Sequence, residues 1–141
     1  MTLLDSYAVL ALLKGEPAAG QVQQLLAEDP VASLTVLGVA EVLDHLVRLA
    51  SADEDEAVLD LAQLGLAAPP ALTAEVALQA GLLRARHYHR RDRAISLADC
   101  VAAESARASG SPVATADPHL LDTCRAEGIG VVPLPDAQGR T

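Results

Sequence analysis

Short apolar runs alternate with helical segments along all 141 residues, and this alternation restricts the fold more than any other feature. The apolar composition of five runs predicts strands at residues 2–4, 31–34, 64–68, 113–115 and 131–132. Periodicity and capping residues predict helices at residues 6–14, 18–28, 35–50, from 51 onward, 73–86, 96–109 and 118–127. This order is typical of an α/β fold, with a mainly parallel sheet and helices on both faces.

The chain shows no internal repeat and no linker, so we expect one domain over residues 1–141. A loose tail is expected after about residue 134. Two helix starts have the spacing of a capping box, Ser51 with Glu54 and Ser96 with Asp99. The acidic run at residues 53–56 is interpreted as a solvated first helical turn rather than a metal site.

The formal net charge is −9, and the only aromatic residues are Tyr7 and Tyr88. A protein that binds nucleic acid by bulk attraction is basic, and general single-strand binders stack bases on aromatic rings. Three possibilities remain open. The chain binds no nucleic acid, it binds through a local basic patch and a metal ion, or it has a basic protein partner.

The two cysteines, Cys100 and Cys124, form no CxxC pair and lie in apolar helical contexts. They are expected to be buried thiols in a reducing compartment. The N-terminal apolar run is interrupted by Asp5 and has no basic segment before it, so no signal peptide is expected. No uncharged stretch reaches the length of a membrane span. We therefore expect a soluble cytoplasmic protein with no membrane partner.

Two acidic residues follow directly on predicted strands. Asp5 ends the first apolar run, and Asp117 comes just after the run at residues 113–115. In open parallel sheets, ligands bind at the carboxyl ends of the strands. Both carboxylates are therefore expected at the same edge of the sheet.

Two further acids have both a local and a functional interpretation. Glu41 has apolar neighbours on both sides, so it either binds a metal ion or points to solvent and pairs with His45. Asp99 occupies the third position of a predicted helix, where an acid is favoured for capping alone. Several carboxylates at one point repel each other unless a hard cation such as Mg²⁺ is bound.

Three segments of the chain resemble motifs of PIN-domain ribonucleases, in particular VapC-type toxins of type II toxin–antitoxin systems. They are residues 4–18, with Asp5 followed by an apolar helix, residues 96–100 (SLADC) and residues 112–118 (PVATADP). Glu41 falls where this family has its second acid. The motifs span nearly the whole chain in the expected order.

The resemblance implies a three-layer α/β/α fold and an Mg²⁺- or Mn²⁺-dependent endoribonuclease. It implies that the metal and catalytic site consists of Asp5, Glu41, Asp99 and Asp117. Ser6 and Thr115 would orient these carboxylates or a water. A homodimer, an RNA substrate and an inhibitory cognate antitoxin are also implied. Many relatives have a further acid shortly after the last motif, where this chain has Pro118 and His119, and Asp122 follows about one helical turn past His119.

The segment at residues 84–93 holds five of the ten Lys and Arg residues of the chain. Its arginines either contact RNA phosphate or satisfy carbonyls at a solvated helix end. We favour phosphate contact, because the rest of the chain is acidic. The expected RNA contacts are Arg84, Arg86, Arg90 and Arg91.

Two other functions compete with the nuclease hypothesis. A catalytically inactive PIN-fold module would use its acidic surface to bind a basic protein partner. A different aspartate-dependent phosphohydrolase is less well supported, because Tyr7 occupies the second position of an Asp-x-Asp nucleophile motif.

Overall fold

The computed structural model describes residues 1–141, and three parallel strands form its sheet in the order β1-β2-β3. The strands are β1 (Leu3–Leu4), β2 (Val113–Thr115) and β3 (Val131–Pro133). β1 pairs with β2, and β2 pairs with β3. Helices connect the strands, because parallel neighbours need a crossover connection. The predicted mainly parallel sheet is confirmed.

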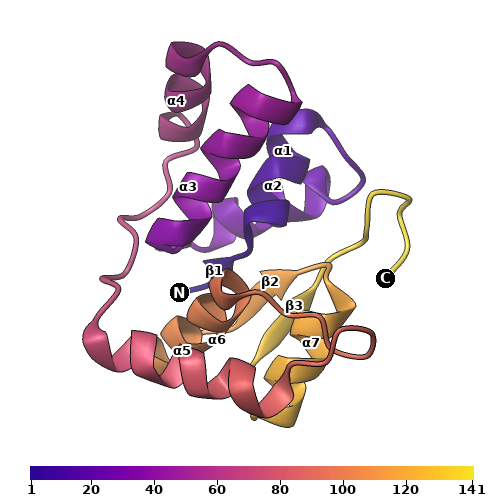
Figure 1. Cartoon of the computed structure of the whole chain (residues 1–141). Helices are drawn as coiled ribbons and strands as arrows, with labels where there is room; N and C mark the ends of the chain where they lie inside the picture. Colours follow the sequence, from indigo (N-terminus) through magenta and orange to yellow (C-terminus); the bar gives the residue numbers. More distant parts are fainter.

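Seven α-helices surround this sheet, and α3 continues into a π-helical turn, η1. They are α1 (Ser6–Lys14), α2 (Ala19–Glu28), α3 (Val36–Asp44), η1 (His45–Leu49), α4 (Glu54–Ala62), α5 (Ala74–His87), α6 (Leu97–Ser109) and α7 (Pro118–Ala126). In Figure 1, α1 to α4 lie on one side of the sheet, and α5 to α7 lie on the other. The predicted three-layer α/β/α architecture is therefore confirmed.

Two hydrophobic cores lie on opposite faces of the sheet. Leu4 and Ala114 belong to the core under α1 to α4. Leu3 and Val113 belong to the core under α5 to α7. Successive residues of a strand point to opposite faces, so these two short strands contribute to both cores. The cores contain mainly Leu, Val, Ala and Ile, since Phe and Trp are absent from the chain.

Two predicted strands are wrong. Residues 31–34 make only one isolated parallel bridge, between Ser33 and Leu3. Residues 64–68 form no strand, and there the Ala67 N–H donates a single hydrogen bond to the Ala32 carbonyl (2.9 Å). That run lacks β-branched residues, and Gly65 has a positive φ of 70°. Both features disfavour pairing in a sheet.

The predicted helix starts are partly correct. The capping box of Ser96 and Asp99 is confirmed at the start of α6. The box predicted at Ser51 is wrong, because the Asp53 carboxylate caps α4 by accepting from the backbone N–H groups of Asp55 and Glu56. Ser51 has φ +57°, which places it outside the helix start.

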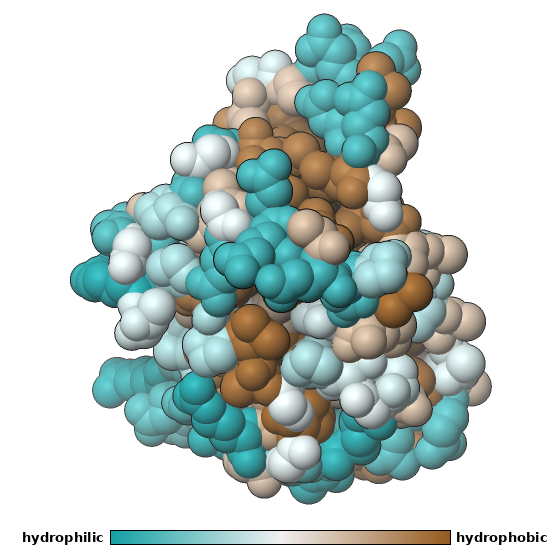
Figure 2. All heavy atoms as spheres, turned by 180° about the vertical axis from the view of Figure 1, so that it is seen from behind, coloured by the Kyte–Doolittle hydropathy of each residue, from teal (hydrophilic) through white to brown (hydrophobic).

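The packed part of the chain extends into the predicted tail. Leu134 is buried, and the Tyr7 hydroxyl donates to the Pro135 carbonyl (2.9 Å). A loose tail after about residue 134 stays a prediction for the residues beyond Pro135. The surface seen from behind exposes a hydrophobic area over the half that α1 to α4 build (Figure 2). None of the helices has the length and apolar character needed to cross a membrane.

Both cysteines are buried free thiols. Burial raises the pKa of Cys100 to about 11 and the pKa of Cys124 to about 12. Thiols with such pKa values are almost entirely protonated near neutral pH and react poorly. The structure therefore agrees with their interpretation as core residues.

Candidate active site

Asp5 and Asp117 lie at the carboxyl ends of neighbouring strands, and Thr115 connects them. The Asp5 N–H donates to the Ala114 carbonyl (2.9 Å), which fixes Asp5 against the end of β2. The buried Thr115 hydroxyl donates to Asp5 Oδ2 (2.7 Å) and accepts from the Asp117 N–H (3.0 Å). One side chain thus orients the first carboxylate and the backbone of the second.

Asp99 reaches the same edge from the start of α6. Its Oδ2 accepts the Ser96 N–H (2.9 Å), and the Ser96 hydroxyl accepts the Asp99 N–H (3.0 Å). The second oxygen, Oδ1, accepts no hydrogen bond within the protein. Capping is therefore compatible with a further ligand on the free oxygen.

Glu41 lies on α3 as an exposed residue close to the other acids. It forms no ion pair with His45, whose Nε2 instead lies 3.1 Å from Lys14 Nζ. The structure thus lacks the Glu41–His45 pair that the sequence left open. The charge of Glu41 raises the pKa of Asp5. Because solvent and salt screen charges over short distances, we assign Glu41 to the same cluster of acids.

The four carboxylates act on one another electrostatically. The pKa of Asp5 is raised to about 6, mainly by burial and also by the charges of Asp99, Glu41 and Asp117, while the Thr115 hydrogen bond opposes the rise. The pKa of Asp99 is also raised, by burial and then by Asp117, and that of Glu41 by burial and then by Asp99. Such mutual repulsion is the condition that a bound cation relieves.

The chemistry of these donors fits a hydrated Mg²⁺ or Mn²⁺ ion. No group of three or more His, Cys, Asp or Glu side chains is arranged to hold a metal ion. Mg²⁺ usually keeps several waters and takes only one or two carboxylates. Asp99 Oδ1 and Asp117 Oδ2 accept no hydrogen bond from the protein and remain open for such contacts.

The four arginines predicted to bind RNA fall into two classes. Arg84 donates to the Ile95 carbonyl (2.9 Å) and lies over the Tyr88 ring, 4.3 Å from its centroid. Arg86 pairs with Glu127 at 3.5 Å. Arg90 and Arg91 are exposed, and their guanidinium groups form no hydrogen bond or ion pair within the chain. Two of the four are thus held by the protein and two are free.

His119 and Asp122 differ in their relation to the acids. His119 Nδ1 lies 3.2 Å from the Asp92 carbonyl oxygen, and its charge is among the effects that lower the pKa of Asp99, against the larger effect of burial. Asp122 is exposed and lies one helical turn further along α7. Of the two, His119 is the residue near the site.

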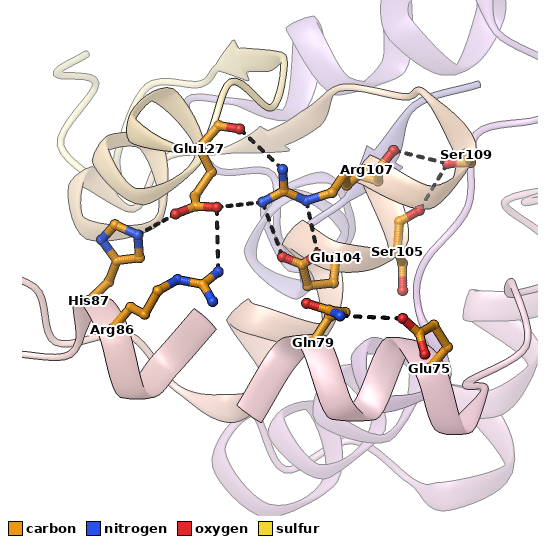
Figure 3. Close-up of polar contacts among 10 residues, drawn as sticks. Glu75, Gln79, Arg86, His87, Glu104, Ser105, Arg107, Ser109 and Glu127 are labelled. Carbon is orange, nitrogen blue, oxygen red and sulfur yellow. Dashed lines mark hydrogen bonds and ion pairs between the residues drawn. The ribbon is translucent and has the colours of Figure 1, made fainter. Parts of the chain in front are cut away.

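Glu127 was not singled out by the sequence, although it has several charged partners. It pairs with His87 (2.6 Å) and Arg107 (2.6 Å), and Arg107 also pairs with Glu104. Glu104, Arg107 and Glu127 line a cleft of about 440 Å³ between α5 and α6 (Figure 3). No sequence pattern indicates these contacts, because Glu127 is 40 positions from His87.

The chain matches the family model of the PIN domain over residues 2–126. No curated protein matches it. Among solved structures, it is similar to VapC20 of Mycobacterium tuberculosis, described as a sarcin-ricin loop cleaving toxin. The TM-score is 0.73 and the identity 22%, with 94% of this chain and 99% of that chain covered.

Two further structures have the same fold. VapBC2 of Rickettsia felis, solved with a DNA fragment of its promoter, has a TM-score of 0.69 and 17% identity, covering 94% of this chain and 98% of that chain. FitAcB of Neisseria gonorrhoeae has a TM-score of 0.67 and 21% identity, covering 93% and 96%. At these identities, the likeness concerns the fold.

Proposed function

The chain belongs to the PIN domain family, and from this premise we propose that it is a metal-dependent endoribonuclease, the toxin of a toxin–antitoxin pair. The observation that carries the proposal is the position of Asp5. It lies at the carboxyl edge of the sheet, in the electrostatic field of Asp99, Glu41 and Asp117. A cluster of carboxylates with raised pKa values at a strand edge is typical of a functional site.

Each acid has a role in this proposal. Asp5 and Asp99 are the principal ligands of Mg²⁺ or Mn²⁺, while Asp117 and Glu41 complete the ligand set or position a water. When bound, the metal would lower the pKa of a coordinated water and stabilise negative charge on the phosphate oxygens. Thr115 keeps Asp5 Oδ2 in one orientation through its 2.7 Å hydrogen bond. Ser6 lies beside Asp5, with its hydroxyl 3.4 Å from Oδ1.

RNA is the proposed substrate, and two observations support it. The similar VapC20 structure is described as a toxin that cleaves the sarcin-ricin loop. Arg90 and Arg91 provide free positive charge on a chain whose net charge is −9. Arginine binds phosphate oxygens through two parallel hydrogen bonds, so a local pair of arginines offsets the acidic composition.

A cognate antitoxin is the proposed protein partner, and a homodimer the proposed assembly. A similar structure from Klebsiella pneumoniae, with a TM-score of 0.69 and 18% identity, is described as a toxin–antitoxin complex. The exposed residues Leu49, Val58 and Leu59 lie in the half that α1 to α4 build, where Figure 2 shows a hydrophobic area. Exposed apolar area of this kind is typical of protein contacts.

The decisive test is cleavage of labelled tRNA and rRNA fragments with Mg²⁺, with Mn²⁺ or with EDTA. We expect cleavage only with metal, and a loss of more than about a hundredfold in Asp5→Asn and Asp99→Asn, because both remove proposed metal ligands. Asp122→Asn is the matched control, since it removes one exposed carboxylate of α7 outside the cluster. Full activity in EDTA, or in either ligand variant, contradicts the proposal.

The competing function is an inactive module that binds a basic protein through its acidic surface. The net charge of −9 favours it, as does the lack of three acids arranged around one metal position. Calorimetry with Mn²⁺ distinguishes the two functions. Absence of Mn²⁺ binding in a chain that still binds its protein partner favours the module.

A further inference from the structure

The free arginines lie on a tight turn. The backbone N–H and carbonyl groups of His89 and Arg93 bond to each other in both directions (2.9 and 3.0 Å). His89 Nδ1 accepts the backbone N–H groups of Arg91 (3.2 Å) and Asp92 (3.1 Å). We call residues 89–93 the basic turn. Its closed hydrogen bonding leaves the side chains of Arg90 and Arg91 exposed at the tip.

The basic turn is joined to two of the elements that carry proposed metal ligands, α7 next to Asp117 and α6 with Asp99. Its Asp92 carbonyl lies 3.2 Å from Nδ1 of His119, two residues after Asp117. On its other side, the buried Ile95 directly precedes Ser96, which caps the helix of Asp99. Arg90 and Arg91 therefore project from a segment anchored beside the acidic cluster.

A series of contacting side chains holds Arg93, the last residue of the basic turn. Arg93 Nη1 lies 2.9 Å from His87 Nδ1, and His87 Nε2 lies 2.6 Å from Glu127 Oε2. A guanidinium can only donate, so Nδ1 of His87 is an acceptor and its Nε2–H donates to Glu127. Figure 3 shows His87 pointing to Glu127 and Glu127 pointing to Arg107. Arg107 in turn binds the buried Glu104 (2.9 Å).

We propose that His87 and Glu127 are positioning residues for the RNA substrate: they hold Arg93, which fixes the basic turn so that Arg90 and Arg91 bind phosphates next to the scissile one. This inference rests on the proposed endoribonuclease function. A turn that is already ordered binds phosphate without the entropy cost of ordering it. His87 contacts Arg93 and Glu127 but none of the four proposed metal-site acids, so in this proposal it acts through Arg93.

The test compares His87→Ala with His87→Gln in the Mg²⁺-dependent cleavage assay. Alanine removes both hydrogen bonds, whereas glutamine keeps one acceptor and one donor. We expect His87→Ala to raise KM about tenfold, equivalent to about 1.4 kcal/mol of binding, with kcat within about twofold of the unsubstituted chain. We expect His87→Gln to restore KM. A purely structural role would lower the active fraction, and hence kcat, without changing KM.

The second arm removes the phosphate contacts directly. Because each contact to a single strand contributes about 0.7 to the slope of log K against log salt, Arg90→Ala/Arg91→Ala should reduce that slope by about 1.4. Binding is measured by fluorescence anisotropy with labelled single-stranded RNA in the Asp5→Asn background. Arg48→Ala/Arg125→Ala is the charge-matched control, since both arginines are exposed and lie outside the basic turn.

The outcomes separate this inference from the proposed function. If the unsubstituted chain neither cleaves nor binds RNA, the endoribonuclease proposal fails. If it cleaves RNA but His87→Ala leaves KM unchanged, or His87→Gln is as impaired as His87→Ala, the positioning role is overturned. An equal loss of salt dependence in the control pair overturns the role of Arg90 and Arg91.

Discussion

At the scale of single residues, Thr115 has the most demanding position in the site. Its hydroxyl is fully buried and has two partners, Asp5 Oδ2 and the Asp117 N–H. A buried hydroxyl that both donates and accepts a hydrogen bond is costly to replace, because each partner then loses a hydrogen bond without access to water. Thr115 therefore connects the stability of the sheet edge to the orientation of the acids.

Thr115→Val tests this connection with little change in shape. We expect the pKa of Asp5 to rise further, because the hydroxyl hydrogen bond lowers it. We expect Mn²⁺ affinity to fall about tenfold, the lower end of typical losses when a group that orients metal ligands is removed. Calorimetry measures the affinity. Thr115→Ser keeps the hydroxyl and is the control, and equal Mn²⁺ affinities in both variants would rule out the orienting role.

At the scale of secondary-structure elements, Arg107 joins three helices. It lies on α6, pairs with the buried Glu104 of the same helix, and binds the carboxylate and carbonyl of Glu127 at the end of α7. Glu127 then reaches His87 and Arg86 of α5. The packing of α5, α6 and α7 therefore includes a charged network at the edge of the cleft shown in Figure 3.

Arg107→Ala should destabilise this layer. It leaves Glu104 buried without its partner, which costs about 2 kcal/mol, in the range measured for buried groups that lose a hydrogen bond. Urea unfolding measures the loss. Arg48→Ala is the control, because Arg48 pairs with Asp44 in an exposed pair that contributes little. A loss no larger than that of the control would show that the network does not stabilise the helical layer.

At the scale of the whole molecule, the protonation of the acids at the sheet edge affects the stability of the fold. The sheet has one core on each face, and the acids lie where its strands end. Asp5 has a pKa of about 6 in the folded chain, above its ordinary value near 3.8. The folded protein therefore keeps a proton over a pH range in which the unfolded chain has lost it.

Because the pKa of Asp5 is higher in the folded chain than in the unfolded chain, Asp5 stabilises the fold most at low pH. The stabilising contribution of Asp5 is fully present below about pH 4 and is lost as the pH rises through about 6, on the order of 3 kcal/mol for a shift of this size. We expect the difference in unfolding free energy between the unsubstituted chain and Asp5→Asn to decrease over this range in EDTA. Saturating Mg²⁺ should oppose the decrease, because it stabilises the ionised carboxylates of the folded state. Urea titrations from pH 4 to pH 7 measure both effects, and parallel profiles of the two chains would contradict the prediction.

The sequence by itself determined the features that depend on neighbouring residues. The capping box of Ser96 and Asp99, the helix after Asp5 and the strand-end positions of Asp5 and Asp117 all follow from local composition and spacing. These features are local because a cap or a strand end is set within a few residues. The extended run at residues 64–68 failed as a strand prediction, since pairing requires a partner that the local sequence does not specify.

The tertiary structure alone decided which side chains meet across the chain. It placed Thr115 between Asp5 and Asp117, and it paired His87 with Glu127. It also separated the arginines, since packing of α5 against its neighbours engages Arg84 and Arg86 and leaves Arg90 and Arg91 free. The physical reason is that such contacts join residues up to 110 positions apart, so they depend on how the layers pack rather than on any local pattern.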